Sequence, residues 1–84
     1  MGQTIDTLKE MFLAENLVPR HKAASFNENF SLLENGIIDS LNLIRLVGLL
    51  EERFTMSIAD NELVPENFEN LTSIATFIDA KKNG

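Results

Sequence analysis

Apolar residues recur at helical spacing in three stretches of this 84-residue chain. In the first stretch, Ile5, Leu8 and Phe12 lie three and four residues apart, as on one face of a helix. Thr4 stands before them with a hydroxyl suited to capping a helix, and Pro19 follows the stretch. The pattern therefore predicts a first helix that begins after Thr4.

The last stretch has the same features. Asn70 is suited to cap a helix. The apolar stripe that follows it consists of Leu71, Ile74, Ala75 and Ile78. Lys81 and Lys82 are favourable at the negative end of a helix dipole, so we predict a final helix that packs through this stripe.

The middle stretch predicts a helix from about Ser40 or Leu41 to Phe54, but its apolar residues do not share one face. At about 100° per residue, the arc that can face a core contains Leu43, Leu46, Val47, Leu50 and Phe54. Leu41, Gly48 and Glu52 fall on nearly the opposite side, and Ile44 and Leu49 lie on the flanks. A helix buried on both sides would explain this pattern, and so would a contact surface for another protein.

Two segments connect the predicted helices. Apolar anchors interrupt the polar segment 18–39 at Phe26, Phe30, Leu32 and Leu33. We expect these anchors to hold a long loop against the helices, with Gly36 in the turn that ends it. Residues 60–68 contain Pro65, which can occupy only a first helical turn, so we predict a short third helix there.

The predicted fold class is therefore all-α. We expect a small four-helix bundle of three longer helices and one short third helix, with a long loop between helices one and two. Residues 1–84 form a single domain in this interpretation.

The composition limits how the fold can be stabilised and where in the cell we expect the protein. The chain has no cysteine, so neither disulfides nor thiolate metal sites support the fold, and nothing argues against a reducing cytoplasm. The longest uninterrupted apolar run, residues 46–50, is far shorter than the ~18 residues that suggest a membrane span. We therefore expect a cytoplasmic protein that is soluble and has no membrane partner.

The net charge of −6 at pH 7 is concentrated in the middle of the chain. Residues 34–69 contain eight acidic residues against Arg45 and Arg53, whereas the rest of the chain is balanced. An acidic region repels phosphate backbones and attracts basic protein surfaces, so we expect no nucleic-acid partner and consider an acidic docking face. A surface that merely keeps the chain in solution would have the same composition.

Ser40 stands where a hydroxyl often caps a helix. Asp39 can supply that cap instead, which would leave the Ser40 hydroxyl at the positive end of the helix dipole. An attached phosphodiester would find favourable electrostatics and N–H donors there. Ser40 is therefore a candidate attachment point.

A catalytic serine and a metal site are disfavoured. A nucleophile needs a base, but the sole histidine, His21, lies in the polar loop, and "IDSLN" lacks the glycines of a nucleophile elbow. The acids of "IADNELVPENFE" lack the spacing and glycine of an EF-hand loop. We predict no catalytic residue and no metal ligand, and we expect these acids to face solvent or a partner.

The segment "GIIDSLNLIRLVGLLEERF" resembles the modification-site helix of the acyl carrier proteins and of their relatives, the peptidyl carrier proteins. Asp39, Ser40 and Leu41 match the Asp-Ser-Leu core of that motif. The likeness extends over nearly the whole chain. "FNENFSLLENGIIDS" resembles the loop before the family's serine, and "PENFENLTSIATFI" resembles the short third helix running into the fourth.

The resemblance implies that a phosphopantetheinyl transferase attaches 4'-phosphopantetheine from coenzyme A to Ser40, with Asp39 and Leu41 beside the attachment point. The arm supplies the thiol that a cysteine-free chain lacks, and this thiol would hold the carried group as a thioester. The carrier would be a monomer and no enzyme, served by acyl- or aminoacyl-loading and processing enzymes. The implied partner-binding residues are Leu41, Asn42, Ile44, Arg45, Gly48, Glu51, Glu52, Asp60 and Glu62.

The sequence departs from the carriers of fatty-acid synthesis at Asn42 and Arg45, where those carriers usually place acids. An arginine five residues after the serine resembles the peptidyl carriers instead. We therefore expect a free-standing carrier of an acyl group in fatty-acid, polyketide or specialised biosynthesis. The alternative is an aminoacyl or peptidyl carrier loaded by an adenylating enzyme, as in nonribosomal peptide synthesis.

Two further expectations depend on the cargo and on the class of protein. A long acyl chain could retreat between the helices beside Leu43, Val47 and Phe54, whereas an aminoacyl group would need no such cavity. The alternative of another class is a helical interaction module that is never modified, in which Ser40 only caps the helix and Leu41 and Ile44 bind another helix.

Overall fold

The computed structural model describes residues 2–83, and the side chains of Ser40 and Asn83 lie outside the described residues. The three α-helices are α1 (Gly2–Ala14), α2 (Ser40–Phe54) and α3 (Leu71–Asn83). Short 3-10 helices occupy the connections, namely η1 (Arg20–Ser25), η2 (Asp60–Glu62) and η3 (Pro65–Asn67). No strand occurs between residues 2 and 83, which confirms the all-α class and the small helical bundle.

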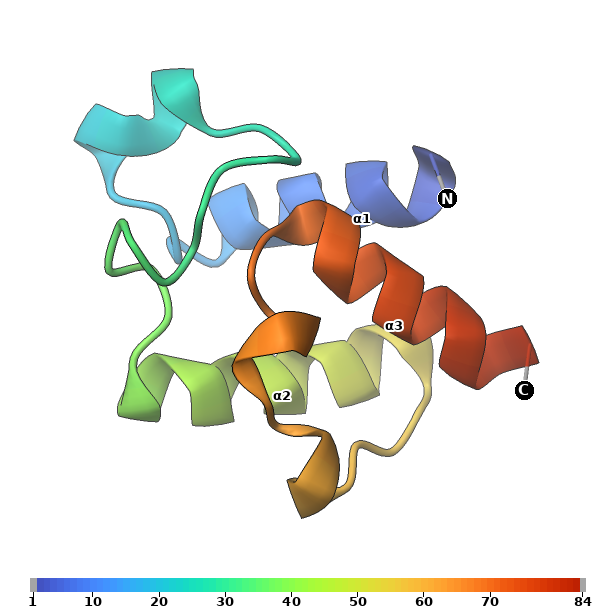
Figure 1. Ribbon diagram of the computed structural model, residues 1–84. Helices are drawn as coiled ribbons and strands as arrows, with labels where there is room; N and C mark the ends of the chain where they lie inside the picture. The colour runs from blue at the N-terminus through green and yellow to red at the C-terminus, as the bar shows by residue number, and fades with distance from the viewer. Residues whose placement is uncertain (1, 84) are drawn as a thin grey trace.

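Figure 1 shows how the helices are connected. The long connection leaves the end of α1, passes through η1 and returns to the start of α2, so that α1 and α2 run in opposite directions. From the end of α2 the chain passes through η2 and η3 and enters α3, which packs against α1. A hydrogen bond from Thr4 Oγ1 to Asp79 Oδ1, 2.9 Å long, joins the start of α1 to α3.

The prediction that Thr4 caps α1 is wrong. The helix begins at Gly2, so Thr4 lies inside it, and its hydroxyl donates to α3 instead. A partner 75 residues away cannot be found from local sequence. The other end of α1 closes as a Schellman motif, in which Asn16 adopts a φ of 58° and the Leu17 N–H donates to the Phe12 carbonyl at 2.9 Å.

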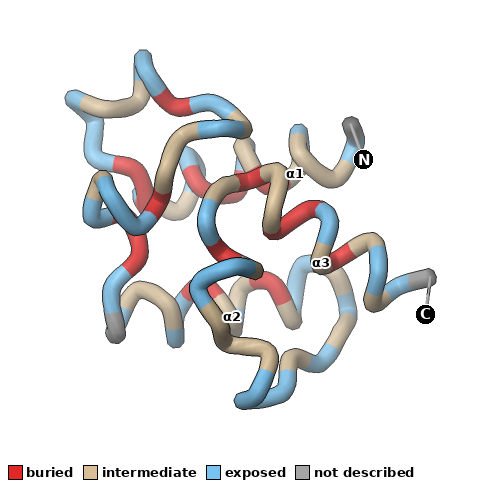
Figure 2. Tube along the Cα trace, viewed as in Figure 1, coloured by how far each residue is buried: buried red, intermediate tan, exposed pale blue. Residues whose placement is uncertain are grey.

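The core joins all three α-helices, and Figure 2 shows its buried segments in red. The predicted stripe of α3, from Leu71 to Ile78, is fully buried. α2 contributes Leu46 and Leu50, as predicted. Val47 was also expected to face the core, but it is only half-buried, and Leu49 packs against the core instead. The core face of α2 is therefore turned further toward Leu49 than the helical wheel indicated.

Aromatic packing anchors the long loop. Phe26 is buried, with its ring stacked on Phe12 at 5.8 Å between centroids and in an edge contact with Phe30 at 5.6 Å. Leu32 is fully buried, as predicted, but Leu33 is 43% exposed and is not an anchor. The Leu32 N–H also donates to the Glu69 carbonyl, so the loop is tied to the segment before α3.

The predicted short third helix is present as two 3-10 turns. Leu63 and Val64 separate η2 from η3, and Pro65 is the first residue of η3. Because proline has no N–H and restricts the residue before it, one continuous helix cannot run through this position. Asn70 then caps α3 as predicted, since its Oδ1 accepts a hydrogen bond from the Ser73 N–H at 2.8 Å.

Candidate functional site

Asp39 defines the start of α2. Its backbone is extended, and its Oδ1 accepts a hydrogen bond from the Asn42 N–H at 2.9 Å. The first backbone bond of the helix runs from the Leu43 N–H to the Asp39 carbonyl at 2.8 Å. Asn42 also ties the helix to the preceding loop, because its side-chain amide donates to the Ile37 carbonyl at 3.2 Å. The prediction that Asp39 supplies the cap is confirmed.

Ser40 is the first residue of α2. Its side chain lies outside the described residues, so the orientation of its hydroxyl stays a prediction. The capping hydrogen bond at this end is accepted by the Asp39 side chain, so the cap does not depend on the serine.

The side of α2 that carries Leu41, Ile44 and Gly48 is here called the docking face. Leu41 is 79% exposed and Ile44 is 70% exposed. A methyl group added at Gly48 would meet no atom within 4 Å apart from its own turn of helix. The interpretation in which α2 is buried on both sides is therefore wrong, and this side of the helix is available for another molecule.

Arg45 lies one turn after Leu41, at the edge of the docking face toward α1. Its Nη2 donates to the backbone carbonyl of Glu15 at 3.0 Å and lies 3.5 Å from the Glu15 carboxylate. Glu15 directly follows α1, so the guanidinium sits at the negative end of that helix. Glu52 is exposed further along the same side of α2.

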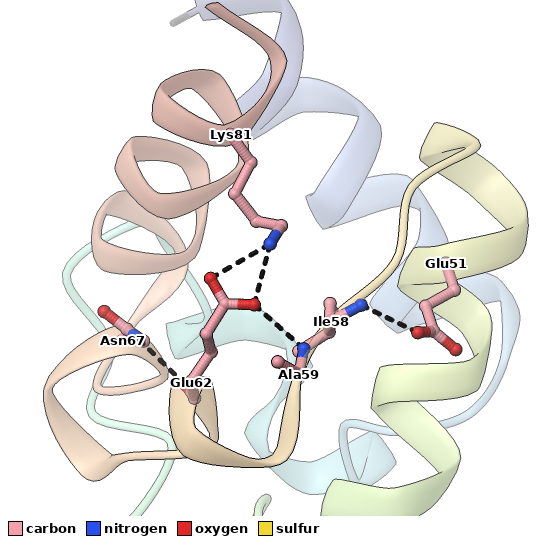
Figure 3. Close-up of polar contacts among 6 residues, drawn as sticks. All are labelled: Glu51, Ile58, Ala59, Glu62, Asn67 and Lys81. Atoms are coloured by element: carbon pink, nitrogen blue, oxygen red, sulfur yellow. Dashed lines mark hydrogen bonds and ion pairs between the residues drawn. The ribbon is translucent and has the colours of Figure 1, made fainter. Parts of the chain in front are cut away.

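Two of the acids assigned to partner binding make hydrogen bonds within their own chain (Figure 3). The Glu51 carboxylate accepts from the Ile58 N–H at 2.8 Å. The Glu62 carboxylate accepts from Lys81 Nζ at 2.7 and 2.9 Å and from the Ala59 N–H at 2.8 Å. Both acids therefore hold the connection between α2 and α3 in place, which sequence reasoning missed because their partners come from that loop and from α3.

The surroundings of Glu62 favour its ionised form. The hydrogen bonds from Lys81 and from the Ala59 N–H, with the charge of the Lys81 ammonium, hold the pKa of Glu62 below its ordinary value of 4.5. Asp60, which opens η2, is exposed. Among these acids, Glu52 and Asp60 are the ones that the described contacts leave to face solvent or a partner.

Two open pockets flank the helices, and neither includes Leu43 or Val47 in its lining. The first, about 380 Å³ in volume, lies between α1 and α2 and is lined by Glu10, Met11, Ala14, Glu15, Leu49, Glu52 and Arg53. The second, about 310 Å³, is lined by Gln3, Thr4, Thr7, Phe54, Asp79 and Lys82. Of the residues predicted to border an acyl cavity, only Phe54 reaches one of these pockets.

Within residues 2–83 no helix is long and apolar enough to cross a membrane. The same part of the chain contains no cluster of three or more histidine or acidic side chains placed to hold a metal ion. His21, the histidine considered as a base, is exposed in η1.

Comparison with known proteins gives a likeness to a solved structure. No family model matches the chain, and no curated protein does. A chain in the "Crystal structure of FAD-dependent dehydrogenase" is 34% identical, with a TM-score of 0.65, over 69% of this chain and 82% of the other. The two chains belong to one family. The matched part makes up 82% of the crystallised chain but 69% of this chain, so the crystallised chain is the shorter of the two.

Proposed function

We propose that this chain is a carrier protein that holds a cargo on a 4'-phosphopantetheine arm attached to Ser40. In the attachment step, the Ser40 oxygen bonds to the phosphorus that carries pantetheine in coenzyme A. The pyrophosphate bond breaks, adenosine 3',5'-bisphosphate leaves, and the serine proton passes to the transferase. When bound, the arm supplies a terminal thiol, which a chain without cysteine cannot provide, and the cargo is carried as its thioester in the cytoplasm.

The observation that carries the proposal is the combination of cap and docking face at the start of α2. Asp39 caps the helix, so the serine beside it is not needed for that purpose. Leu41, which directly follows the serine, and Ile44, three residues further on, expose most of their apolar surface instead of burying it. An attachment point beside an apolar contact surface would let an enzyme bind the carrier while it acts on the tethered group.

The helix start also suits a phosphodiester. The Leu41 N–H precedes the first backbone hydrogen bond of α2, so it belongs to the unpaired N–H groups at a helix start. These groups and the helix dipole favour an anion. The exposed Asp39 carboxylate repels the negative charge of a phosphodiester, but solvent screens this repulsion. The carboxylate also already accepts a hydrogen bond from the Asn42 N–H.

A mass measurement tests the proposal. The purified chain is incubated with coenzyme A and a broad-specificity phosphopantetheinyl transferase, and its intact mass is compared with that of Ser40→Ala. Ser57→Ala is the matched control, because Ser57 is an exposed serine in the connection after α2. We expect wild type and Ser57→Ala to gain one phosphopantetheinyl group and Ser40→Ala to gain none. An unchanged wild-type mass with several transferases would favour the unmodified interaction module.

A flavin-dependent dehydrogenase is a candidate partner enzyme. The support is the description of the crystal structure that contains the related chain. Dinucleotide sites of the doubly wound kind need parallel strands, and residues 2–83 contain none, so we place the flavin outside this part of the chain. In this proposal the enzyme removes two hydrogens from the tethered group, and FAD takes up both electrons.

This partnership is tested with acyl-loaded and aminoacyl-loaded carrier mixed anaerobically with a purified FAD-dependent acyl dehydrogenase. We expect the flavin absorbance to fall with one of the loaded forms and not with the unloaded carrier, which also identifies the cargo class. No change with either loaded form would argue against a dehydrogenase partner while leaving the carrier role intact.

A further inference from the structure

The docking face contains a positive charge although the chain as a whole is acidic. Arg45 is the only charged residue between Ser40 and Leu50, so the first turns of α2 contain one cation and no anion. Its neighbours on the docking face, Leu41 and Ile44, are apolar and exposed. A chain with a net charge of −6 therefore offers an apolar surface with a positive edge at the place where partners would dock.

The carboxylates around this surface offset Arg45 only in part. Asp39 directs an oxygen to the Asn42 N–H, and Glu51 directs one to the Ile58 N–H. Glu62 pairs with Lys81, which neutralises its charge locally. Glu52, beyond Gly48, is the exposed acid on this side of the helix.

The guanidinium of Arg45 is held in position but still accessible. Its bond to the Glu15 carbonyl fixes it at the end of α1, and the side chain remains 51% exposed. Its contact with the Glu15 carboxylate, 3.5 Å away and also open to solvent, is of a kind worth ~0–1 kcal/mol. A partner's carboxylate can replace Glu15 at little cost, and a guanidinium that is already positioned loses less freedom when it binds.

We propose that Arg45 makes the docking face select partner enzymes that present a carboxylate beside an apolar contact, and reject those that present lysine or arginine there. This inference rests on the proposed carrier function. The competing interpretation is that Arg45 only stabilises the end of α1. In that case its replacement lowers stability and leaves the choice of partner unchanged.

The test uses a phosphopantetheinyl transferase with a basic carrier-binding surface, and a variant of it in which the lysines and arginines of that surface are replaced by glutamate. The kcat/KM for transfer from fluorescent coenzyme A is measured on wild type, Arg45→Gln and Arg45→Glu. Arg53→Gln is the matched control, because it removes the same charge from an exposed arginine on the same helix, about 12 Å further along. Circular dichroism and thermal melts confirm that each carrier variant is folded.

With the basic transferase we expect Arg45→Gln to raise kcat/KM about 2-fold and Arg45→Glu about 5- to 10-fold, as for charges at the edge of an interface. With the acidic variant of the transferase, the order of the kcat/KM values reverses, and the wild-type carrier is the best substrate. Arg53→Gln changes either value by less than about 1.5-fold, and all differences shrink in 1 M salt, where the Debye length is about 3 Å.

Equal kcat/KM values for wild type and both Arg45 variants, with Ser40 still modified, would overturn the inference and leave the carrier function standing. A lower melting temperature with unchanged kcat/KM would assign Arg45 to stability alone. Failure of every variant, wild type included, to accept the arm would instead refute the carrier function on which the inference rests.

Discussion

Replacing Gly48 with alanine should stabilise the protein. Glycine inside a helix costs ~1 kcal/mol relative to alanine, mainly because the unfolded chain loses more conformational freedom when it folds. Gly48 lies within α2 and is exposed, and an added methyl group would meet nothing beyond its own helical turn. We therefore expect the free energy of unfolding to rise by about 0.5–1 kcal/mol, which corresponds to about 2–8 °C in melting temperature for a domain of this size.

The matched control is Gly36→Ala. Gly36 has a φ of 70°, and an added methyl group would also meet nothing within 4 Å. Only the backbone conformation differs between the two sites, and the left-handed region costs a residue with a side chain ~1–2 kcal/mol. Gly36→Ala should therefore destabilise the protein by about 1 kcal/mol, opposite in sign to Gly48→Ala.

Urea denaturation followed by circular dichroism at 222 nm measures both effects, and transferase kinetics on the same samples test the docking face. Gly48→Ala should be more stable and yet a poorer transferase substrate, because the methyl group hinders close approach to the helix. A less stable Gly48→Ala protein would refute the open environment of this residue. A stabilised protein with wild-type kinetics would show that partners do not use Gly48.

Four further substitutions test the site and its surroundings. Asp39→Ala should lower the free energy of unfolding by about 1 kcal/mol in urea titrations, because it removes the cap of α2. Leu41→Ser should change it by less than about 0.5 kcal/mol, since the side chain is exposed, whereas buried Leu46→Ala should lower it by about 2–5 kcal/mol. Because the pKa of Glu62 is lowered in the folded state, its stabilising contribution is present above pH 4.5 and is lost as the pH falls through the folded-state pKa. Lys81→Met should therefore lower the urea midpoint at pH 7, and this deficit should shrink as the pH is lowered below 4.5. A deficit that does not change with pH would refute this role of the ion pair.

The local features of the site could be predicted from the sequence. Asp39 as the cap and the bounds of α2 follow from the order of residues in one short segment, whereas the sequence is compatible with both burial and exposure of Leu41 and Ile44. Capping and helical periodicity are local effects, so neighbouring residues contain the necessary information.

The features that sequence reasoning missed depend on contacts between distant parts of the chain. The hydroxyl of Thr4 binds α3, and Glu62 binds Lys81, neither of which periodicity can indicate. The half-exposure of Val47 reflects how α2 is turned against its neighbours. The hydrogen bond from Ile58 to Glu51 depends on the path of an irregular loop. Because of these contacts, the carboxylates of Glu51 and Glu62 are already hydrogen-bonded within the chain and do not simply face outward, as the sequence suggested.

The most direct measurement is the intact mass of the chain after co-expression with a phosphopantetheinyl transferase, followed by tandem mass spectrometry of the peptide that contains Ser40. The carrier account predicts one added phosphopantetheinyl group, located on the oxygen of that serine. An unmodified peptide, or a group located on another residue, would contradict it.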